Sequence, residues 1–377
     1  MWGRLAASRS LVEIFATPML TRWSDRVGRR RVIIFCTCAL ICESLFLAQA
    51  SSLLALGAVH VGFGMLADSH GALEYSCIAD TVPEQQRAVA YGRLSTAVGL
   101  GLVVGPFFGG EVAALFGSHA PFVLAAAFAA GSLAFVVLRL PEYLPPVSRK
   151  GAACDGMRKL PSGGGGPLQL CQDFAAMVLD SRELCWYMAG LIFLNLGLGA
   201  YRAVQALWGR EALSWGSREL GRFMSFNGVA VAIAQWLLLP WLRRAARNQD
   251  GRLAQACLLV SAAKHCAYAL APQGAQACIW VYFVTAVGAP SHCGLSALRS
   301  LVSRCAPPER QGLLTGGVSS LVIVAQTVGA LLGSQVLAAA LRRGLAGGTP
   351  LFFSAACIAL GASCIATGAT ARGRRGE

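Results

Sequence analysis

The feature that most constrains the fold of this 377-residue chain is a series of apolar runs, most of them about twenty residues long or longer, separated by segments that hold most of the charged side chains. A helical run of that length matches the hydrocarbon core of a bilayer, because a helix rises about 1.5 Å per residue and the core is roughly 30 Å thick. Backbone polar groups in lipid must bond within their own segment, which favours helices. The runs therefore predict membrane-spanning α-helices.

Read in order, the apolar runs predict eleven spans on either side of one polar segment. Five come before it, at residues 5–21, 32–50, 53–79, 92–114 and 119–140. Six come after it, at residues 183–208, 219–240, 253–271, 276–298, 312–341 and 350–370. We therefore expect an all-α polytopic membrane protein with an N-terminal bundle at 1–140, a C-terminal bundle at 183–371 and a tail at 372–377.

The polar segment at residues 141–182 is expected to be a flexible linker between the bundles. It contains several prolines, five cations and the glycine run 163–166, and it lacks a long apolar run. Such a composition is typical of mobile tethers. A phosphate-binding loop is not indicated, because no Gly-Lys-Ser/Thr follows the glycines.

The distribution of Lys and Arg predicts the orientation in the membrane. One set of alternate loops, including the linker and the C-terminal tail, holds 23 of these cations, whereas the opposite set holds five. Cytoplasmic loops of membrane proteins retain Lys and Arg. The linker and the C-terminus are therefore expected to face the cytoplasm; the sequence does not identify which membrane.

Composition excludes several other classes of protein. Charged residues make up 13% of the chain, against roughly 25% in average soluble domains. The net charge of +14 is scattered between spans and forms no contiguous basic stripe, so we expect no nucleic-acid partner. Most of the 14 cysteines lie in apolar runs, where a free cysteine acts as a small hydrophobe, and none has zinc-site spacing. We expect no metal, no cofactor and no enzymatic activity.

A weak internal repeat relates the two halves. Residues 79–87 and 303–311 each place a proline and a glutamate before a glycine-containing span, and both lie on the predicted cytoplasmic side. Two copies on the same side indicate parallel repeats about an axis along the membrane normal, as in transporters built from two halves.

The loop at residues 21–30 is unusually charged for its length. Its notable residues are Asp25, Arg26, Gly28, Arg29 and Arg30. A turn at the glycine would let the carboxylate and the arginines form charge-assisted hydrogen bonds at the membrane surface, and such a cluster is able to latch helix ends in one conformation. The alternative is a simple anchor that follows the positive-inside rule.

This loop resembles the motif between the second and third helices of the major facilitator superfamily, with Thr21 in place of the family's leading glycine. A second resemblance is to the fifth-helix pattern of the family's proton-coupled antiporters. It covers Gly92, Gly101, Gly105, Pro106, Gly109 and Gly110. Small residues let helices approach closely and a proline interrupts a backbone hydrogen bond, so a close-packed, bent helix is expected. A generic glycine-rich packing face is the alternative.

Within that superfamily the chain is similar to the branch of tetracycline efflux proteins and hippocampus abundant transcript proteins, for example over residues 296–304. The resemblance implies two six-helix bundles, and it implies that the sequence starts within the second helix, so that the first is missing. It also implies an arginine in the fourth helix, where this chain has His60, four residues before Gly64.

The span at 53–79 contains several ionisable side chains. They are His60, Asp68, His70 and Glu74. At 100° per residue they share an arc of about 160°, so one side of the helix is expected to face protein or water. Asp68 or Glu74 would then hold a transported proton; a static buried pair is the equal alternative. Glu43 is expected to face the same cavity.

Two cations in the second half, Arg202 and Lys264, are expected to oppose those carboxylates or to contact an anionic substrate. His265, which is adjacent to Lys264, is a third candidate for the same role. Snorkelling to the outer interface is the alternative, especially for Arg202, which is near its span end.

Together these features predict a monomeric secondary transporter in a lipid bilayer that exports or exchanges a small organic solute against protons. Two alternatives stay open. One is a facilitator without proton coupling, and the other is a membrane sensor or scaffold that retains the fold without transporting. The sequence does not identify the substrate, because specificity depends on cavity shape and on a few side chains from several helices.

The topology yields a direct prediction. Epitope tags placed in the 141–182 linker and at residues 272–275 are expected to be accessible from opposite sides of the membrane, because an odd number of predicted spans separates them. Antibody accessibility before and after permeabilisation measures this. Labelling of both tags from one compartment would contradict the predicted spans.

Overall fold

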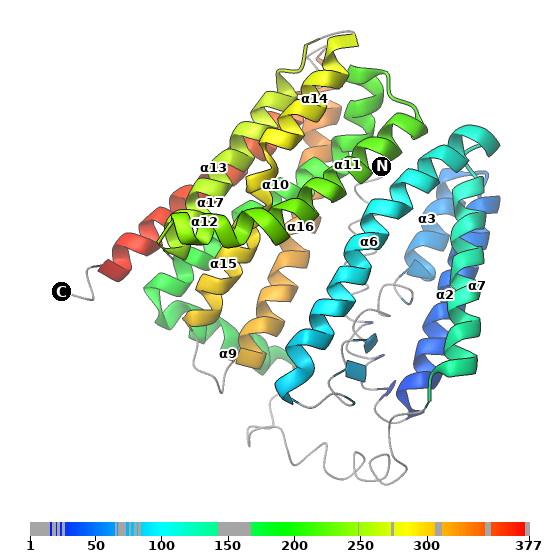
Figure 1. The fold of residues 1–377 in the computed structure, drawn as a ribbon, viewed down its shortest axis with the longest axis horizontal. Coiled ribbons are helices and arrows are strands. Elements are labelled where there is room, and N and C mark those ends of the chain that lie inside the picture. Colours follow the sequence, from blue (N-terminus) through cyan, green and yellow to red (C-terminus); the bar gives the residue numbers. More distant parts are fainter. Residues whose placement is uncertain are drawn as a thin grey trace. The chain divides into compact units, whose positions relative to one another are not determined.

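The computed structural model describes most of the chain as helices grouped in two compact units. The described residues are 16, 20, 23–24, 27–64, 66, 73–74, 77–78, 81, 84–141, 167–247, 249–272, 275–305, 311–343 and 348–373. Every regular element among them is helical. The first unit is chiefly Gly3–Gly164 with Ser217–Arg222, and the second is chiefly Gly165–Gly216 with Phe223–Glu377 (Figure 1).

The first unit is built around the packing of two long helices. Its helices are α2 (Arg29–Gln49), α3 (Leu53–Gly62), α6 (Glu84–Phe116) and α7 (Ala120–Arg139). Helices α2 and α7 lie side by side (Figure 1). Val32, Ile33 and Cys36 of α2 pack with Val136 of α7 in a small buried core. The Ser52 hydroxyl accepts a hydrogen bond from the Ala55 N–H at 3.1 Å, which caps α3 after the loop.

The second unit contains more helices, and two of its spans are interrupted. Its helices are α9 (Pro167–Asp180), α10 (Arg182–Leu213), α11 (Ser217–Ile233), the π-helix η1 (Ala234–Leu238), α12 (Leu239–Ala245), α13 (Asp250–Ala269), α14 (Ala275–Val287), the 3₁₀ turn η2 (Ala289–His292), α15 (Cys293–Arg304), α16 (Gln311–Arg342) and α17 (Thr349–Gly373). The first residues of α11, Ser217–Arg222, group with the first unit.

Among the described residues, seven helices are long and apolar enough to cross a membrane, or eight if the bent pair Gln276–Val287 and Ala289–Val302 counts as one span. The all-α membrane architecture is confirmed, whereas the count of eleven stays a prediction. The predicted span 5–21 and much of 53–79 fall outside the described residues. Helix α13 is 20 residues long, but Arg252, Lys264 and His265 reduce its apolar character.

The helices extend beyond the predicted apolar runs. Helix α6 has 33 residues, and α10 and α16 have 32 each. At about 1.5 Å per residue each is longer than the hydrocarbon core. Helix α6 begins at Glu84, eight residues before the predicted run, because residues 84–91 include good helix formers such as Glu, Gln and Arg. The apolar runs therefore miss the start of α6 and the end of α10, whereas they give both ends of α16 to within one residue.

Part of the predicted flexible linker is a helix. Residues 167–180 form α9, whose Phe174, Met177 and Val178 pack against the core of the second unit. These positions recur at helical spacing and make one apolar face. The glycine and proline content of the segment concealed this pattern. Residues 142–166 of the predicted linker lie outside the described residues.

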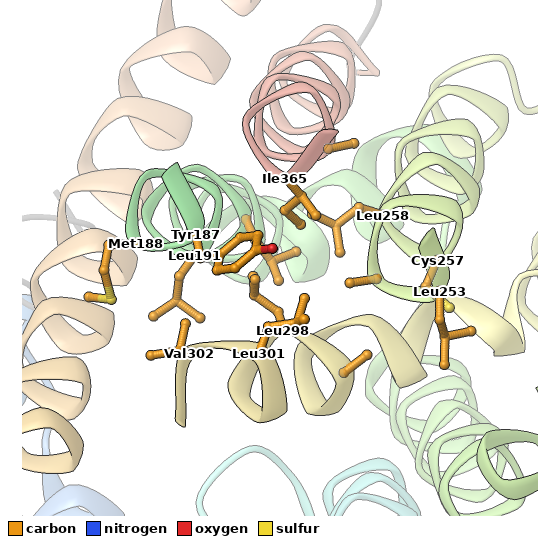
Figure 2. Packing of buried hydrophobic residues seen from close by; sticks show 14 of the residues in the cluster. Tyr187, Met188, Leu191, Leu253, Cys257, Leu258, Leu298, Leu301, Val302 and Ile365 are labelled. Atoms are coloured by element: carbon orange, nitrogen blue, oxygen red, sulfur yellow. The ribbon is translucent and has the colours of Figure 1, made fainter. Parts of the chain in front are cut away.

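The core of the second unit is a cluster of apolar side chains that includes one tyrosine and comes from α10, η1, α13, α15, α16 and α17. Figure 2 shows Tyr187 and Leu191 of α10 near Leu258 of α13 and Leu298 of α15, with Ile365 of α17 beside them. Burying such side chains excludes both water and lipid from the bundle interior.

Glycines let α10 approach its neighbours at backbone distance. A Cβ added to Gly190 would lie 3.1 Å from the carbonyl oxygen of Gly361 on α17, and the reciprocal distance is 3.0 Å. On α16, a Cβ on Gly329 would overlap the backbone of Leu196. Membrane helices associate by such close van der Waals packing, since lipid is as apolar as their side chains. The glycines therefore fix α10 against α16 and α17.

Asp250 joins three helix ends of the second unit. It is 3% exposed at the start of α13. Its carboxylate lies 3.2 Å from Nε of Arg243 on α12 and 2.7 Å from Nη2 of Arg304 on α15, and it accepts a hydrogen bond from the Ser300 hydroxyl at 3.1 Å. An acidic residue at a helix N-terminus also complements the helix dipole.

Close packing at Gly329 predicts a large penalty for one added methyl group. We expect Gly329→Ala to lower the free energy of unfolding by about 1–3 kcal/mol through overpacking against the Leu196 backbone. Gly251→Ala is the matched control, because its Cβ would meet only Ala369 at an ordinary 3.8 Å. Thermal unfolding of the purified protein in detergent measures both; equal midpoints would contradict the packing argument.

Candidate functional site

The first part of the candidate site is the arginine-rich segment that leads into α2. Gly28 has a φ of 113°, a backbone conformation that favours glycine, and its N–H donates to the Ser24 carbonyl at 3.0 Å. The Arg29 guanidinium donates to the Ser24 hydroxyl, and that of Arg30 donates to the carbonyl of Val137 at the end of α7. These bonds tie the start of α2 to the preceding turn and to α7.

The two remaining motif residues, Asp25 and Arg26, lie outside the described residues. The proposed latch between the carboxylate and the arginines therefore stays a prediction.

The glycines of the fifth-helix motif differ in their surroundings. All six motif residues lie in α6, which continues through Pro106. A Cβ on Gly101, Gly105 or Gly109 would meet nothing within 4 Å, whereas one on Gly110 would lie 2.7 Å from the carbonyl oxygen of Ser217, a residue of the same unit. Among these four positions, only Gly110 packs so closely against another backbone that an added side chain would not fit.

An acid–imidazole pair with a buried carboxylate joins α2 to α3. Nδ1 of His60 lies 3.0 Å from Oε1 of Glu43, and the side chains of Glu43 and His60 are 6% and 20% exposed. Both groups belong to predicted membrane spans, where an isolated charge is costly and a partner offsets much of that cost. The pair brings together an expected proton-site residue and a carboxylate from the neighbouring helix.

The sequence contained a signal for this pair. Glu43 lies eight residues before Ser51 and His60 lies nine after it, on either side of the short loop at 50–52. Two antiparallel helices that leave one loop place such positions at nearly the same depth, because both rise about 1.5 Å per residue. Depth counted from the loop would have predicted the contact.

The other predicted proton-site residues are less completely described. Glu74 is half-buried on a helical turn, whereas Asp68 and His70 lie outside the described residues. Their shared arc with His60 stays a prediction.

A chain of amide hydrogen bonds connects Arg202 to the interior of the second unit. Nη1 of Arg202 donates to Oε1 of Gln326 at 3.2 Å, and Nε2 of Gln326 donates to Oδ1 of Asn195 at 2.9 Å. Asn195 is fully buried and donates in turn to the Leu191 carbonyl at 2.8 Å. This chain holds an exposed guanidinium on the α10–α16 seam, so Arg202 has a defined partner in addition to the solvent.

Lys264 is buried in α13, 8% exposed, beside the interrupted span α14–α15. Its stem lies against the backbone at Gly288, where an added Cβ would be 2.6 Å from Cδ of the lysine. The adjacent His265 points elsewhere: its ring is 4.8 Å from that of Tyr201 on α10, in an edge-to-face contact. Arg202 and Lys264, the two cations predicted to contact carboxylates or a substrate, thus both belong to the second unit, on α10 and α13.

Gln235, a neutral hydrogen-bonding residue within a predicted span, connects two irregular helices, and the sequence did not predict its partners. Its Nε2 donates to the His292 carbonyl at 2.9 Å, and its Oε1 accepts from the Ser296 hydroxyl at 3.1 Å. The π-helix η1 precedes Pro240 and η2 contains Pro290; a proline ring clashes with the carbonyl four residues earlier, which explains both interruptions. Prolines inside predicted spans were the available signal.

The comparisons with known proteins agree with this architecture. A family model described as Major Facilitator Superfamily matches residues 2–334. The tetracycline resistance protein, class E, of Escherichia coli is 26% identical over 342 residues, which cover 88% of this chain and 77% of that protein. The human hippocampus abundant transcript 1 protein is 24% identical over 327 residues, 85% and 62% of the two chains.

A solved structure is also similar. The human organic anion transporter MFSD10 (TETRAN) matches with a TM-score of 0.59 at 20% identity, over 96% of this chain and 83% of that chain. At this level of identity the similarity shows a shared fold.

The backbone at Gly28 predicts a specific sensitivity in the charged loop. We expect Gly28→Ala to lower the free energy of unfolding by about 1–3 kcal/mol, because φ at this position is one that side-chain-bearing residues rarely adopt. Gly62→Ala in α3 is the control, since a Cβ there meets nothing within 4 Å. Thermal unfolding in detergent compares them, and a Gly28→Ala midpoint at or above that of the control would contradict the expectation.

Proposed function

Because the chain belongs to the Major Facilitator Superfamily, we propose that it moves a small organic solute across its membrane by alternating access, with protons as the coupling ion. The family and the apolar helices make the chain an integral multi-pass membrane protein, and its relatives are membrane transporters and not enzymes. Proton coupling, direction, orientation and a monomeric state are parts of the proposal.

The observation that supports proton coupling is the buried Glu43–His60 pair. Its Nδ1–Oε1 distance of 3.0 Å is that of a hydrogen bond. With Glu43 ionised and His60 neutral, Nδ1 donates to the carboxylate and the pair carries one negative charge. An added proton on the imidazole or on the carboxyl group makes the pair neutral overall and leaves a hydrogen bond in place. The pair can therefore take up and release one proton without losing its contact.

Protonation changes the net charge of the Glu43–His60 pair, and this changes the electrostatic interaction energy between the pair and the charged groups around it. Placing the neutral pair in a low-dielectric environment costs less free energy than placing the charged pair there. Protonation would thus favour one side-exposed conformation over the other, which is the requirement for coupling a proton gradient to the movement of a solute.

The arginine-rich start of α2 supports a gating role at the cytoplasmic side. Arg29 and Arg30 are already held by Ser24 and by the end of α7. We assign Asp25 and Arg29 to a latch that closes this side in one conformation. The direction is proposed to be outward, since several relatives are named tetracycline resistance proteins.

The test is proton movement in proteoliposomes that contain a trapped pH-sensitive dye. We expect addition of tetracycline, or of another member of a panel of small organic solutes, to drive proton flux through the wild-type protein. Glu43→Gln is expected to reduce solute-linked proton flux at least tenfold, because the amide holds no exchangeable proton. Glu211→Gln is the matched control, at an exposed position near the end of α10.

Three results would count against the proposal in different ways. Solute uptake that ignores an imposed pH gradient would identify a facilitator without proton coupling. Full coupling in Glu43→Gln would move the proton site elsewhere. Binding of solutes without uptake under any gradient would identify a sensor or scaffold that retains the fold.

A further inference from the structure

The second unit contains a largely buried lysine, Lys264, whose ammonium group has no partner among the described residues. Lys264 is 8% exposed, and it makes no hydrogen bond or ion pair with any described residue. A lone cation at this depth in a membrane protein is expensive, and the desolvation cost is several kcal/mol before compensation. By contrast, Arg202 of the same unit donates to Gln326.

Apart from Asp250, helices α13 to α17 contain no carboxylate. Between Gly251 and Gly376 the only acidic residue is Glu309, which follows α15. The nearest preceding acid, Asp250, is engaged by Arg243 and Arg304. It also lies fourteen residues from Lys264 along the same helix, or about 21 Å. Helices α14 to α17 therefore supply no negative charge to Lys264, and the other acids of the second half lie on α9, α10 and α11 or at Glu309.

Two further polar groups without partners lie at the helix interruption beside Lys264. The Ser291 hydroxyl and Nε2 of His292 are buried and make no hydrogen bond within the described part of the chain. Both belong to η2, directly after Gly288, whose backbone contacts the lysine stem. Lys264, Ser291 and His292 thus belong to two elements, α13 and η2, that pack against each other at the interruption.

The interruption lies near the middle of its span. Helices α14 and α15 have 13 and 12 residues on either side of it, and they meet at an angle of 53°. Lys264 is five residues from the end of α13, and a helical side chain points toward the N-terminus, which directs its ammonium group away from that end. Interrupted helices near the bilayer centre are where transporters of this architecture bind their substrates.

The geometry points to a binding site for an organic anion: we propose that Lys264, Ser291 and His292 hold the carboxylate of the transported solute. The inference rests on the proposed transport function and adds its substrate class. The ammonium supplies the opposite charge, and the hydroxyl and imidazole donate to the carboxylate oxygens. Gln235 keeps the interruption in place through its bond to the His292 carbonyl.

Stability of the empty protein provides the first test. We expect Lys264→Met in the full chain to raise the unfolding temperature in anion-poor buffer, because methionine keeps the stem and removes an uncompensated charge. Arg210→Met, at an exposed site, is the control. A fall in the midpoint of Lys264→Met that Asp68→Asn or Glu74→Gln restores would identify an internal ion pair and overturn the proposal.

Binding provides the second test. The probes are acetate, hexanoate, benzoate and a larger aryl carboxylate, each compared with its neutral amide. We expect at least one carboxylate to bind the wild-type protein more tightly than its amide, Lys264→Met to weaken that binding at least tenfold, and Ser291→Ala and His292→Gln to weaken it severalfold. Equal binding of every acid and amide, or unchanged binding in Lys264→Met, would overturn the site.

These results are separable from those for proton coupling. Carboxylate binding that depends on Lys264, in a protein that moves no protons, would retain the anion site and reject the proposed coupling. Loss of coupling in Glu43→Gln with unchanged carboxylate binding would support both assignments, since Glu43 and Lys264 belong to different units.

Discussion

The cost of placing a charge in a low-dielectric interior is the constraint on which the rest of this structure depends. Two arginines and a serine compensate the charge of Asp250, and His60 compensates that of Glu43. In both cases the partners come from helices that are consecutive in the chain or that pack together. Lys264 has no carboxylate on α13 to α17 apart from the distant Asp250, and the proposed carboxylate of the solute would compensate its charge.

Backbone proximity determines where those polar groups lie. Glycines at 190, 199 and 329 allow α10 to contact the main chains of α16 and α17. That contact places Asn195 within hydrogen-bonding distance of Gln326, and Gln326 within reach of Arg202. Since lipid gives no hydrophobic driving force between helices, the small residues and the amide bonds together fix the seam.

The sequence predicted the features that depend on local composition and much less of those that depend on contacts between distant segments. The apolar runs predicted helices such as α2, α7 and α17, because lipid thickness imposes their length. They could not show where α6 begins or where α10 ends, since a helix continues beyond an apolar run when the next residues are good helix formers. The helix α9 was hidden by flanking glycines and prolines.

For the site, Lys264 and His60 were identified from their cost in an apolar span, whereas their surroundings were not. The Glu43 contact could have been found by counting residues from the connecting loop. The bond between Gln235 and His292, 57 residues apart, could not, because it depends on two irregular turns that face each other. Irregular turns at prolines have no fixed periodicity from which to extrapolate.

The π-helix at residues 234–238 has a consequence for comparing this chain with its relatives. A π turn closes five residues apart instead of four, so it is equivalent to an insertion of one residue in a regular helix. Every later position is rotated by about 100° from the place that an uninterrupted helix would give it. A relative with a regular helix here should align with a single-residue gap; without that gap, Arg243 would be matched to a residue on another face, and the ancestry of its bond to Asp250 would be misread.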